Sequence, residues 1–247
     1  MNRAERRKQA KSRRGGAPSL AQAQALLERG RDGEARRLLD RLLTQTPEDA
    51  AAWQLFGLLA LRQGEAARAV EALRKADSLT PGDSGLRTNL AIALGQAGEG
   101  EAALETLEAV LSAAPDYAPA LFNKAVLLRE TGQEAAALAA LDAALAARPD
   151  YRKAAGERAR LLRDLGRYAA AAADYARADS ADAESLLDWG RCLQESGDLE
   201  GALALYRRLL AQNPGSYVAV VKTLSMASKG MVYLHPSELR RRLLEHG

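Results

Sequence analysis

The side chains that most often carry catalysis or hold metals are scarce in this sequence. It contains one cysteine, Cys192, and two histidines, His235 and His246, so neither a CxxC pair nor an HExxH motif can be formed. The phosphate-binding pattern GxxxxGKS/T and the hydrolase pattern GxSxG do not occur either. We therefore expect a protein that is not an enzyme and uses neither a cofactor nor a metal.

Most of the remaining residues belong to a pattern of small and large side chains that recurs every 34 residues. The first four units share a glycine, an alanine, a leucine and a proline, at Gly30, Ala35, Leu39 and Pro47, then Gly64, Ala69, Leu73 and Pro81, then Gly98, Ala103, Leu107 and Pro115, then Gly132, Ala137, Leu141 and Pro149. A fifth unit keeps Gly166, Ala171 and Tyr175 but lacks the proline and about three residues around 179–182. A sixth unit restores the pattern at Gly197, Ala202, Tyr206 and Pro214. Such periodicity indicates consecutive copies of one structural unit.

The unit resembles the tetratricopeptide repeat, a helix-turn-helix of about 34 residues. In 50–83, Trp53 and Gly57 lie in a first helix, Gly64 breaks it, and Pro81 ends the second. The resemblance covers roughly 19–216 and implies an all-α fold, a right-handed superhelical solenoid of stacked antiparallel helix pairs. The repeats are expected at 19–49, 50–83, 84–117, 118–151, 152–182 and 183–216.

The physical roles of the repeated residues follow from their sizes. Small side chains should let the two helices of a pair approach, at Gly57, Ala91, Ala125, Ala159 and Gly190 in the first helices and at the repeated alanines in the second. Each glycine between the helices should take a positive φ. Aspartates after the prolines, as at Pro115 and Pro149, should help to cap the next helix. A bulky residue at Gly98 or Ala125 should overpack one joint, at about 1–3 kcal/mol.

In tetratricopeptide proteins the first helices line a concave groove, so the resemblance implies which side chains face a ligand. In the fifth unit, Lys153, Glu157, Arg160 and Asp164 follow the helical period beside the packing stripe of Ala155, Ala159 and Leu162. The corresponding residues of the other units are Leu55, Leu58 and Arg62, then Asn89, Ile92 and Gln96, then Asn123, Val126 and Glu130, then Asp188, Arg191 and Glu195. The predicted groove is apolar towards the N-terminus and charged towards the C-terminus, which suits a peptide with one apolar and one polar end.

We expect a partner to contact Leu55, Asn89, Ile92, Asn123, Val126, Lys153, Glu157, Arg160, Asp188 and Arg191. An amide at Asn89 or Asn123 can donate to and accept from a peptide backbone, as asparagines of related proteins do, although both could be ordinary solvated residues. Lys153, Glu157 and Arg160 could instead neutralise one another along their helix.

The subgroup of the family that clamps the C-terminal carboxylate of chaperones needs basic and amide residues that this chain lacks. Asn123 and Lys153 fit the clamp, but Thr88, Ile92 and Glu157 stand where lysine, asparagine and arginine are expected. Carboxylate clamping of that kind is therefore not expected.

The two ends of the chain depart from the repeat. The formal net charge is +3, yet residues 1–16 carry seven basic residues against Glu5, namely Arg3, Arg6, Arg7, Lys8, Lys11, Arg13 and Arg14. We expect 1–18 to be a disordered or weakly helical arm that either touches RNA or another acidic surface or only aids solubility. Residues 217–247 should form a capping helix, a short extended segment and a terminal helix, or else a docking or dimerising tail.

Together these features predict a scaffold that binds a protein or peptide partner in the groove. Two alternatives stay open, which are an RNA- or ribosome-associated factor acting through the arm and an accessory subunit of a glycosyl- or sulfo-transferase. The chain has no secretory signal and no run of about 20 apolar residues, so we expect a cytoplasmic protein without an integral membrane segment. Its oligomeric state is left open.

Overall fold

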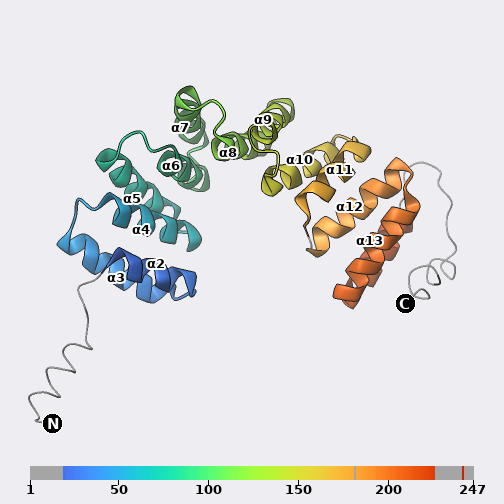
Figure 1. Cartoon of the computed structure of the whole chain (residues 1–247), viewed down its shortest axis with the longest axis horizontal. Helices are drawn as coiled ribbons and strands as arrows, with labels where there is room; N and C mark the ends of the chain where they lie inside the picture. The colour runs from blue at the N-terminus through green and yellow to red at the C-terminus, as the bar shows by residue number, and fades with distance from the viewer. Residues whose placement is uncertain (1–18, 181, 226–240, 242–247) are drawn as a thin grey trace, which may run out of the picture. The chain divides into compact units, whose positions relative to one another are not determined.

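The computed structural model describes residues 19–180, 182–225 and 241. Within them the chain forms thirteen α-helices and one short 3-10 helix, and no strand. The fold is the expected all-α arrangement of antiparallel helix pairs (Figure 1). The basic arm and the segment from 226 to the C-terminus, apart from residue 241, lie outside the described residues.

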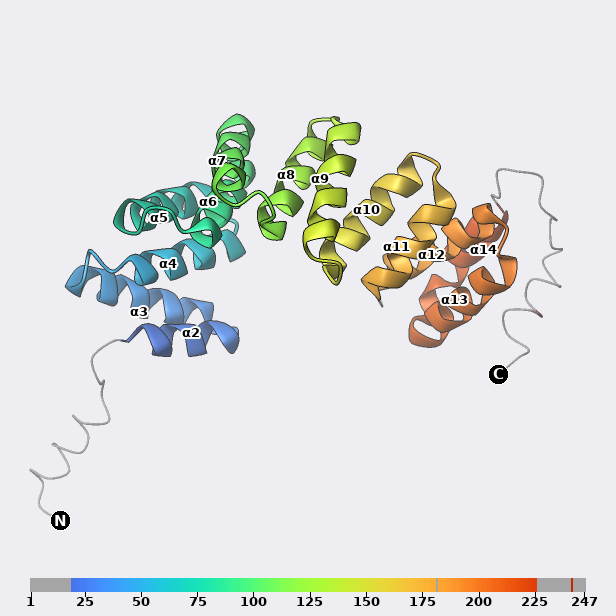
Figure 2. The same cartoon turned by 45° about the horizontal axis from the view of Figure 1, so that its top comes forward.

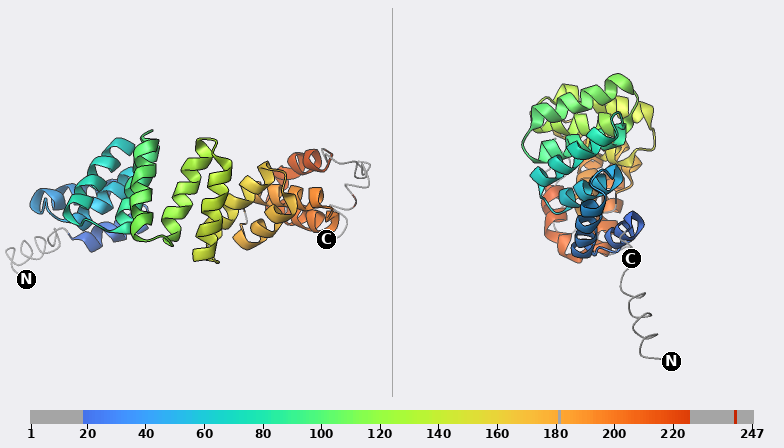
Figure 3. Two further views of the ribbon diagram at one scale, coloured as in Figure 1. Left: turned by 90° about the horizontal axis from the view of Figure 1, so that it is seen from above. Right: turned by 90° about the vertical axis from the view of Figure 1, so that its left-hand side faces the viewer.

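The helices divide between two compact units, and the border falls inside α8 (Ala118–Glu130). Unit 1 contains α2 (Leu20–Glu28), α3 (Asp32–Gln45), α4 (Ala50–Arg62), α5 (Ala66–Leu79), α6 (Ser84–Gln96), α7 (Gly100–Ala113) and the first turns of α8. From α2 to α7, helices that are neighbours in the chain pack on each other, and α4 also contacts both α2 and α6. The first helices of the three pairs in unit 1, α2, α4 and α6, therefore form a row; Figure 2 labels them, and Figure 3 shows the ribbon from two other sides.

Unit 2 contains the rest of α8 and the later pairs. These are α9 (Glu134–Ala147), α10 (Arg152–Asp164), α11 (Tyr168–Ala178), α12 (Ala183–Ser196), α13 (Leu199–Gln212), the 3-10 turn η1 (Pro214–Ser216) and α14 (Tyr217–Ser225). Helix α14 packs against α12, where Val220 is fully buried in the core of the last pair (Figure 2). The expected helix after Pro214 is thus present through Ser225, and the later segments expected at 231–234 and from 236 lie outside the described residues.

The predicted close approach of paired helices is present in both units. The repeated alanines Ala69, Ala103, Ala137, Ala171 and Ala202 are fully buried. A Cβ added to Gly57 would lie 2.6 Å from Cγ of Leu73, and one added to Gly190 would lie 2.4 Å from Cε1 of Tyr206. These glycines are required because the second helix packs directly on their backbone.

The glycines between paired helices have the predicted positive φ, from 71° at Gly30 and Gly166 to 98° at Gly197. The expected overpacking at Gly98 is wrong, however, because a Cβ there would meet nothing within 4 Å. Its φ of 82° makes the backbone conformation the reason for glycine at this position.

The helix caps that follow the prolines agree with the expectation at two junctions and differ from it before α10. Asp49 and Asp83, two residues after a proline, accept hydrogen bonds from the amides of Ala52 and Leu86. After Pro149 the cap position is instead held by Tyr151, which makes no side-chain cap bond. Asp150 is one residue too early to cap α10, so the predicted role of the Pro-Asp pair is wrong there.

The missing residues of the fifth repeat are taken from its second helix. Helix α11 has 11 residues, whereas α5, α7, α9 and α13 have 14 each. Asp179 ends α11 with a left-handed φ of 50°, and Asp182 caps α12 by accepting from the amide of Ser185. The shorter repeat thus keeps its first helix, α10, at full length. The residues of α12 still correspond to those of the earlier first helices once the shortening is allowed for.

Candidate functional site

The row of first helices in unit 1 carries apolar side chains and an amide without an internal partner. Leu58 on α4 is 36% exposed, and Asn89 and Ile92 on α6 are half-buried. Leu55 is also half-buried but packs against the core of the first pair. Leu58 and Ile92 occupy the same place in successive repeats, so this row offers an apolar strip to a ligand.

The two predicted asparagines differ in how far their amides are already used. The side chain of Asn89 makes no hydrogen bond within the described residues. Asn123, one repeat later, donates through Nδ2 to the carbonyl oxygen of Pro119 at 2.7 Å. Asn89 therefore keeps its full capacity to donate and accept, whereas Asn123 has one donor committed to its own helix.

Arg62, predicted at the end of the same strip, turns away from it. Its guanidinium donates to the carbonyl oxygen of Leu27 at 3.2 Å and pairs with Asp32. Arg62 thus connects the second repeat to the first and is not available to a ligand in this arrangement.

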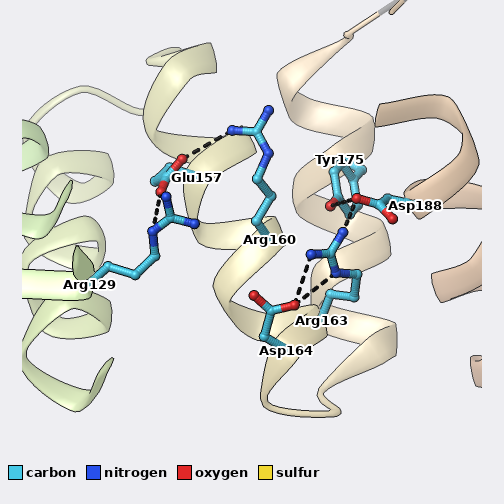
Figure 4. Close-up of polar contacts among 7 residues, drawn as sticks. All are labelled: Arg129, Glu157, Arg160, Arg163, Asp164, Tyr175 and Asp188. Atoms are coloured by element: carbon cyan, nitrogen blue, oxygen red, sulfur yellow. Dashed lines mark hydrogen bonds and ion pairs between the residues drawn. The ribbon is translucent and has the colours of Figure 1, made fainter. Parts of the chain in front are cut away.

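Unit 2 presents a different surface on its first helices, because acidic side chains there are held by arginines. Glu157 on α10 is only 6% exposed. Its Oε1 lies 2.8 Å from Nε of Arg129 on α8, and its Oε2 accepts from Nη1 of Arg160 at 3.1 Å (Figure 4). The predicted open position of Glu157 is therefore wrong, and the alternative of mutual neutralisation with Arg160 is present.

A second arrangement of the same kind follows one repeat later. Asp188 on α12 pairs with Arg163 on α10 and accepts a hydrogen bond from the hydroxyl of Tyr175 at 3.4 Å. Arg163 also contacts Asp164 at 2.8 Å (Figure 4). The side chain of Asp188 is 18% exposed, so this predicted contact residue is mostly occupied by its own neighbours. Burial raises the pKa of Tyr175 to about 12, which keeps its hydroxyl protonated as the donor.

These two ion pairs occupy equivalent positions. Arg129 and Arg163 are 34 residues apart, and Glu157 and Asp188 share a place once the shortened fifth repeat is allowed for. Each arginine extends from one first helix to the acid of the next, so the pairs form a ladder that we call the arginine–acid ladder. In unit 1 the arginine places hold Leu61 and Gly95, and no rung forms. The ladder was not predicted from the sequence, where its signal is the pair of arginines at 129 and 163, one repeat apart.

The remaining predicted contact residues of unit 2 vary in exposure. Lys153 and Arg191 are exposed and take part in no ion pair within the described part of the chain, and the side chain of Arg160 is 41% exposed. Val126 on α8 is half-buried. Lys153, Arg160 and Arg191 thus keep charge available to a ligand.

The residues assigned to packing in both units do pack. Trp53 donates from Nε1 to the carbonyl oxygen of Pro47 at 2.8 Å and meets Phe56 edge-on, and Trp189 contacts the cores of the last two pairs. Cys192 is fully buried, and burial raises the pKa of its thiol to about 11. An inert thiol is the consequence.

The described residues form neither a metal-binding cluster nor a membrane-spanning helix. They contain no cluster of three or more histidine, cysteine, aspartate or glutamate side chains that could hold a metal ion. None of their helices combines the length and the apolar character needed to cross a bilayer.

Family models described as tetratricopeptide repeat match the chain at residues 60–121, 96–161 and 162–224, and at 20–84. The chain belongs to the tetratricopeptide repeat family. No curated protein sequence matches it.

Solved structures of this fold are similar over most of the chain. Pseudomonas aeruginosa PilF superimposes with a TM-score of 0.68 at 22% identity and covers 80% of this chain and 91% of its own. PilW, described as a widely conserved type IV pilus biogenesis factor, gives 0.68 at 22% over 78% and 91%. YrrB, described as a tetratricopeptide protein with an unusual peptide-binding site, gives 0.53 at 18% over 74% and 95%. At these identities the similarity shows a shared fold.

Proposed function

We propose that this protein is a non-enzymatic scaffold that binds a peptide segment of a partner protein on the first-helix row of unit 1. The observation that carries the proposal is the unpartnered amide of Asn89 on the same first-helix row as the apolar side chains of Leu58 and Ile92. The amide can pair with a peptide backbone whatever its side chains are, and the strip can bury apolar residues of the peptide. The description of YrrB as peptide-binding supports this use of the fold.

The test is a selection of displayed random peptides on the full chain, followed by titration of the enriched peptides. Asn89→Ala with Asn123→Ala should weaken binding about tenfold, the value of one or two hydrogen bonds to a desolvated backbone. Gln45→Ala is the matched control, because it removes an exposed amide from a second helix of the same unit. Unchanged affinity in the double variant would reject the proposed surface.

The basic arm supports a second candidate function, contact with RNA or ribosomes. Seven basic residues within the first sixteen give a dense positive charge that releases counterions on binding phosphate. A pull-down with the full chain and with a chain lacking residues 1–16, each at low and high salt, separates the two functions. RNA that is lost with the arm and with salt supports this candidate, whereas a protein partner retained by both forms supports the scaffold.

A further inference from the structure

Glu157 in unit 2 is a buried carboxylate bounded by two arginines. The side chain is 8% exposed, with Arg129 at one oxygen and Arg160 at the other. Oε1 of Glu157 and Nε of Arg129 lie 2.8 Å apart, yet neither atom is aligned for a hydrogen bond, and both are buried. A buried donor and acceptor left in this state are unfavourable, so this rung of the ladder is imperfectly satisfied.

The charges around this rung do not balance. Two guanidinium groups face one carboxylate, and Lys153, one helical turn before Glu157, has no ion pair within the described residues. The acids of the neighbouring rung, Asp164 and Asp188, are both used by Arg163. Asp182 at the start of α12 is also within electrostatic reach, since Arg160 contributes to lowering its pKa. Three cations, Arg129, Arg160 and Lys153, thus stand against two carboxylates, Glu157 and Asp182, and the first-helix surface beside Glu157 keeps an excess positive charge.

Arg160 has the more exposed side chain of the two arginines at this rung, at 41% against 36% for Arg129. Its one Nη1 contact to Glu157 leaves other donors of the planar fork directed elsewhere (Figure 4). A guanidinium fork matches a carboxylate better than any other partner group of a protein.

We propose that Arg160 of unit 2, with Arg129 beside it, binds an aspartate or glutamate side chain of a partner peptide, and that Glu157 is an internal carboxylate occupying this place when no ligand is bound. This inference rests on the proposed peptide-binding function and names its ligand chemistry. An incoming carboxylate pairs with the exposed fork of Arg160 and competes with Glu157 for it. Glu157 thus lowers the affinity for acidic ligands. A ligand without a carboxylate cannot replace Glu157 at Arg160 and gains no affinity there.

The test is a parallel selection from a displayed random peptide library on four forms of the full chain. They are the unsubstituted protein, Arg160→Gln, Glu157→Gln and the control Arg177→Gln. Arg177 is an exposed arginine on the second helix α11, so its substitution changes the net charge equally without touching the rung. Displayed peptides continue into the coat protein, so their side chains are the only carboxylates that they present.

The expected result is enrichment of acidic residues by the unsubstituted protein and by Arg177→Gln, and loss of that enrichment with Arg160→Gln. In titrations of the enriched peptides, Arg160→Gln should weaken binding about tenfold, as expected for one charge-assisted hydrogen bond. Glu157→Gln should strengthen it about threefold because the competing charge is removed. Both variants should retain the helical circular dichroism of the unsubstituted chain, because glutamine matches the size of Glu157 and keeps the Cβ, Cγ and Cδ atoms of the partly exposed Arg160.

Two other outcomes overturn this inference and separate it from the scaffold proposal. Peptides that depend on Asn89 but show no acidic preference, or that bind Arg160→Gln equally well, reject the acidic ligand and leave the unit 1 surface standing. Absence of any enriched peptide rejects both proposals. Acidic peptides that depend on Arg160 and not on Asn89 support the inference and reject the unit 1 surface.

Discussion

Units 1 and 2 are built from the same repeat, yet they use equivalent first-helix positions in opposite ways. The place held by Leu55 and Asn89 in unit 1 is held by Glu157 and Asp188 in unit 2. The place of Leu61 and Gly95 is held by Arg129 and Arg163. In unit 1 these positions leave an amide without an internal partner, and in unit 2 they form the arginine–acid ladder.

Besides the pair of Arg62 on α4 with Asp32, unit 1 joins successive repeats by ion pairs of arginines on its second helices. Arg36 on α3 lies 2.6 Å from Glu65, and Arg74 on α5 lies 3.2 Å from Glu99, each acid standing just before the next second helix. Connections between repeats can therefore be placed on either side of the helix pairs. On the first helices of unit 1, where no arginine–acid rung forms, the amide of Asn89 stays available for a ligand.

The largest expected effect concerns the packing that both units share. Gly190→Ala should lower the free energy of unfolding of unit 2 by about 2–3 kcal/mol, because the added Cβ would meet the buried ring of Tyr206. Gly57→Ala should do the same to unit 1 against Leu73. Denaturant unfolding followed by Trp189 in a Trp53→Phe background, and by Trp53 in a Trp189→Phe background, reads each unit separately.

Gly156→Ala is the control for both substitutions. Its Cβ would lie at an ordinary 3.6 Å from Cβ of Ala178, so the better helix propensity of alanine should stabilise unit 2 by about 0.5–1 kcal/mol. Equal destabilisation by all three substitutions would contradict the packing argument.

The next effect distinguishes the two units. Asp188→Ala should destabilise unit 2 by about 2 kcal/mol. The loss is smaller than that expected for breaking a fully buried ion pair, because Arg163 still pairs with Asp164 and is partly exposed to solvent. Asn89→Ala, at the equivalent place in unit 1, should change stability by less than about 0.5 kcal/mol. The same two tryptophan backgrounds measure both. A larger loss for Asn89→Ala than for Asp188→Ala would reverse the comparison.

Alkaline pH should weaken unit 2 selectively. The pKa of Cys192 is raised by burial from 9.0 to about 11, so the unfolded chain releases this proton first and the stability of unit 2 falls as pH rises from about 9 to 11. The loss should be about 1–2 kcal/mol, with Tyr175 adding to it at higher pH. Cys192→Ala should flatten the profile reported by Trp189 between about pH 9 and 10, below the range in which the buried Tyr175 and Tyr206 contribute. A steeper alkaline loss reported by Trp53 would contradict the assignment.

The smallest effect belongs to unit 1. The hydrogen bond from Arg36, followed by that from Arg68, lowers the pKa of Glu65 below 4.5. This pair stabilises the fold above the unfolded pKa and is lost as pH falls through the folded value. Arg36→Gln should move the Glu65 pKa, read from an NMR titration of its side-chain carboxyl carbon, back towards 4.5. An unchanged titration would show that Arg68 alone sets it.

The frame of the molecule could be predicted from the sequence because it depends on local steric requirements. A turn that needs a positive φ requires glycine, and a close helix contact requires alanine, so the two residues recur at a fixed spacing in the sequence. Gly64, with its positive φ, and the fully buried Ala69 are examples. The accessibility of Glu157 could not be predicted in the same way. Its burial depends on Arg129, a residue 28 positions away that no local periodicity connects to it. The overpacking expected at Gly98 failed for a related reason, since the space around a turn is set by tertiary packing.

Hydrogen–deuterium exchange of the full chain with and without an enriched peptide tests the central claim most directly. The claim is that the first-helix row of unit 1 is the peptide-binding surface. Added protection should be concentrated in α4 and α6, around Leu58 and Asn89. Protection confined to the second helices α5 and α7, or to α10 and α12 alone, would contradict the claim.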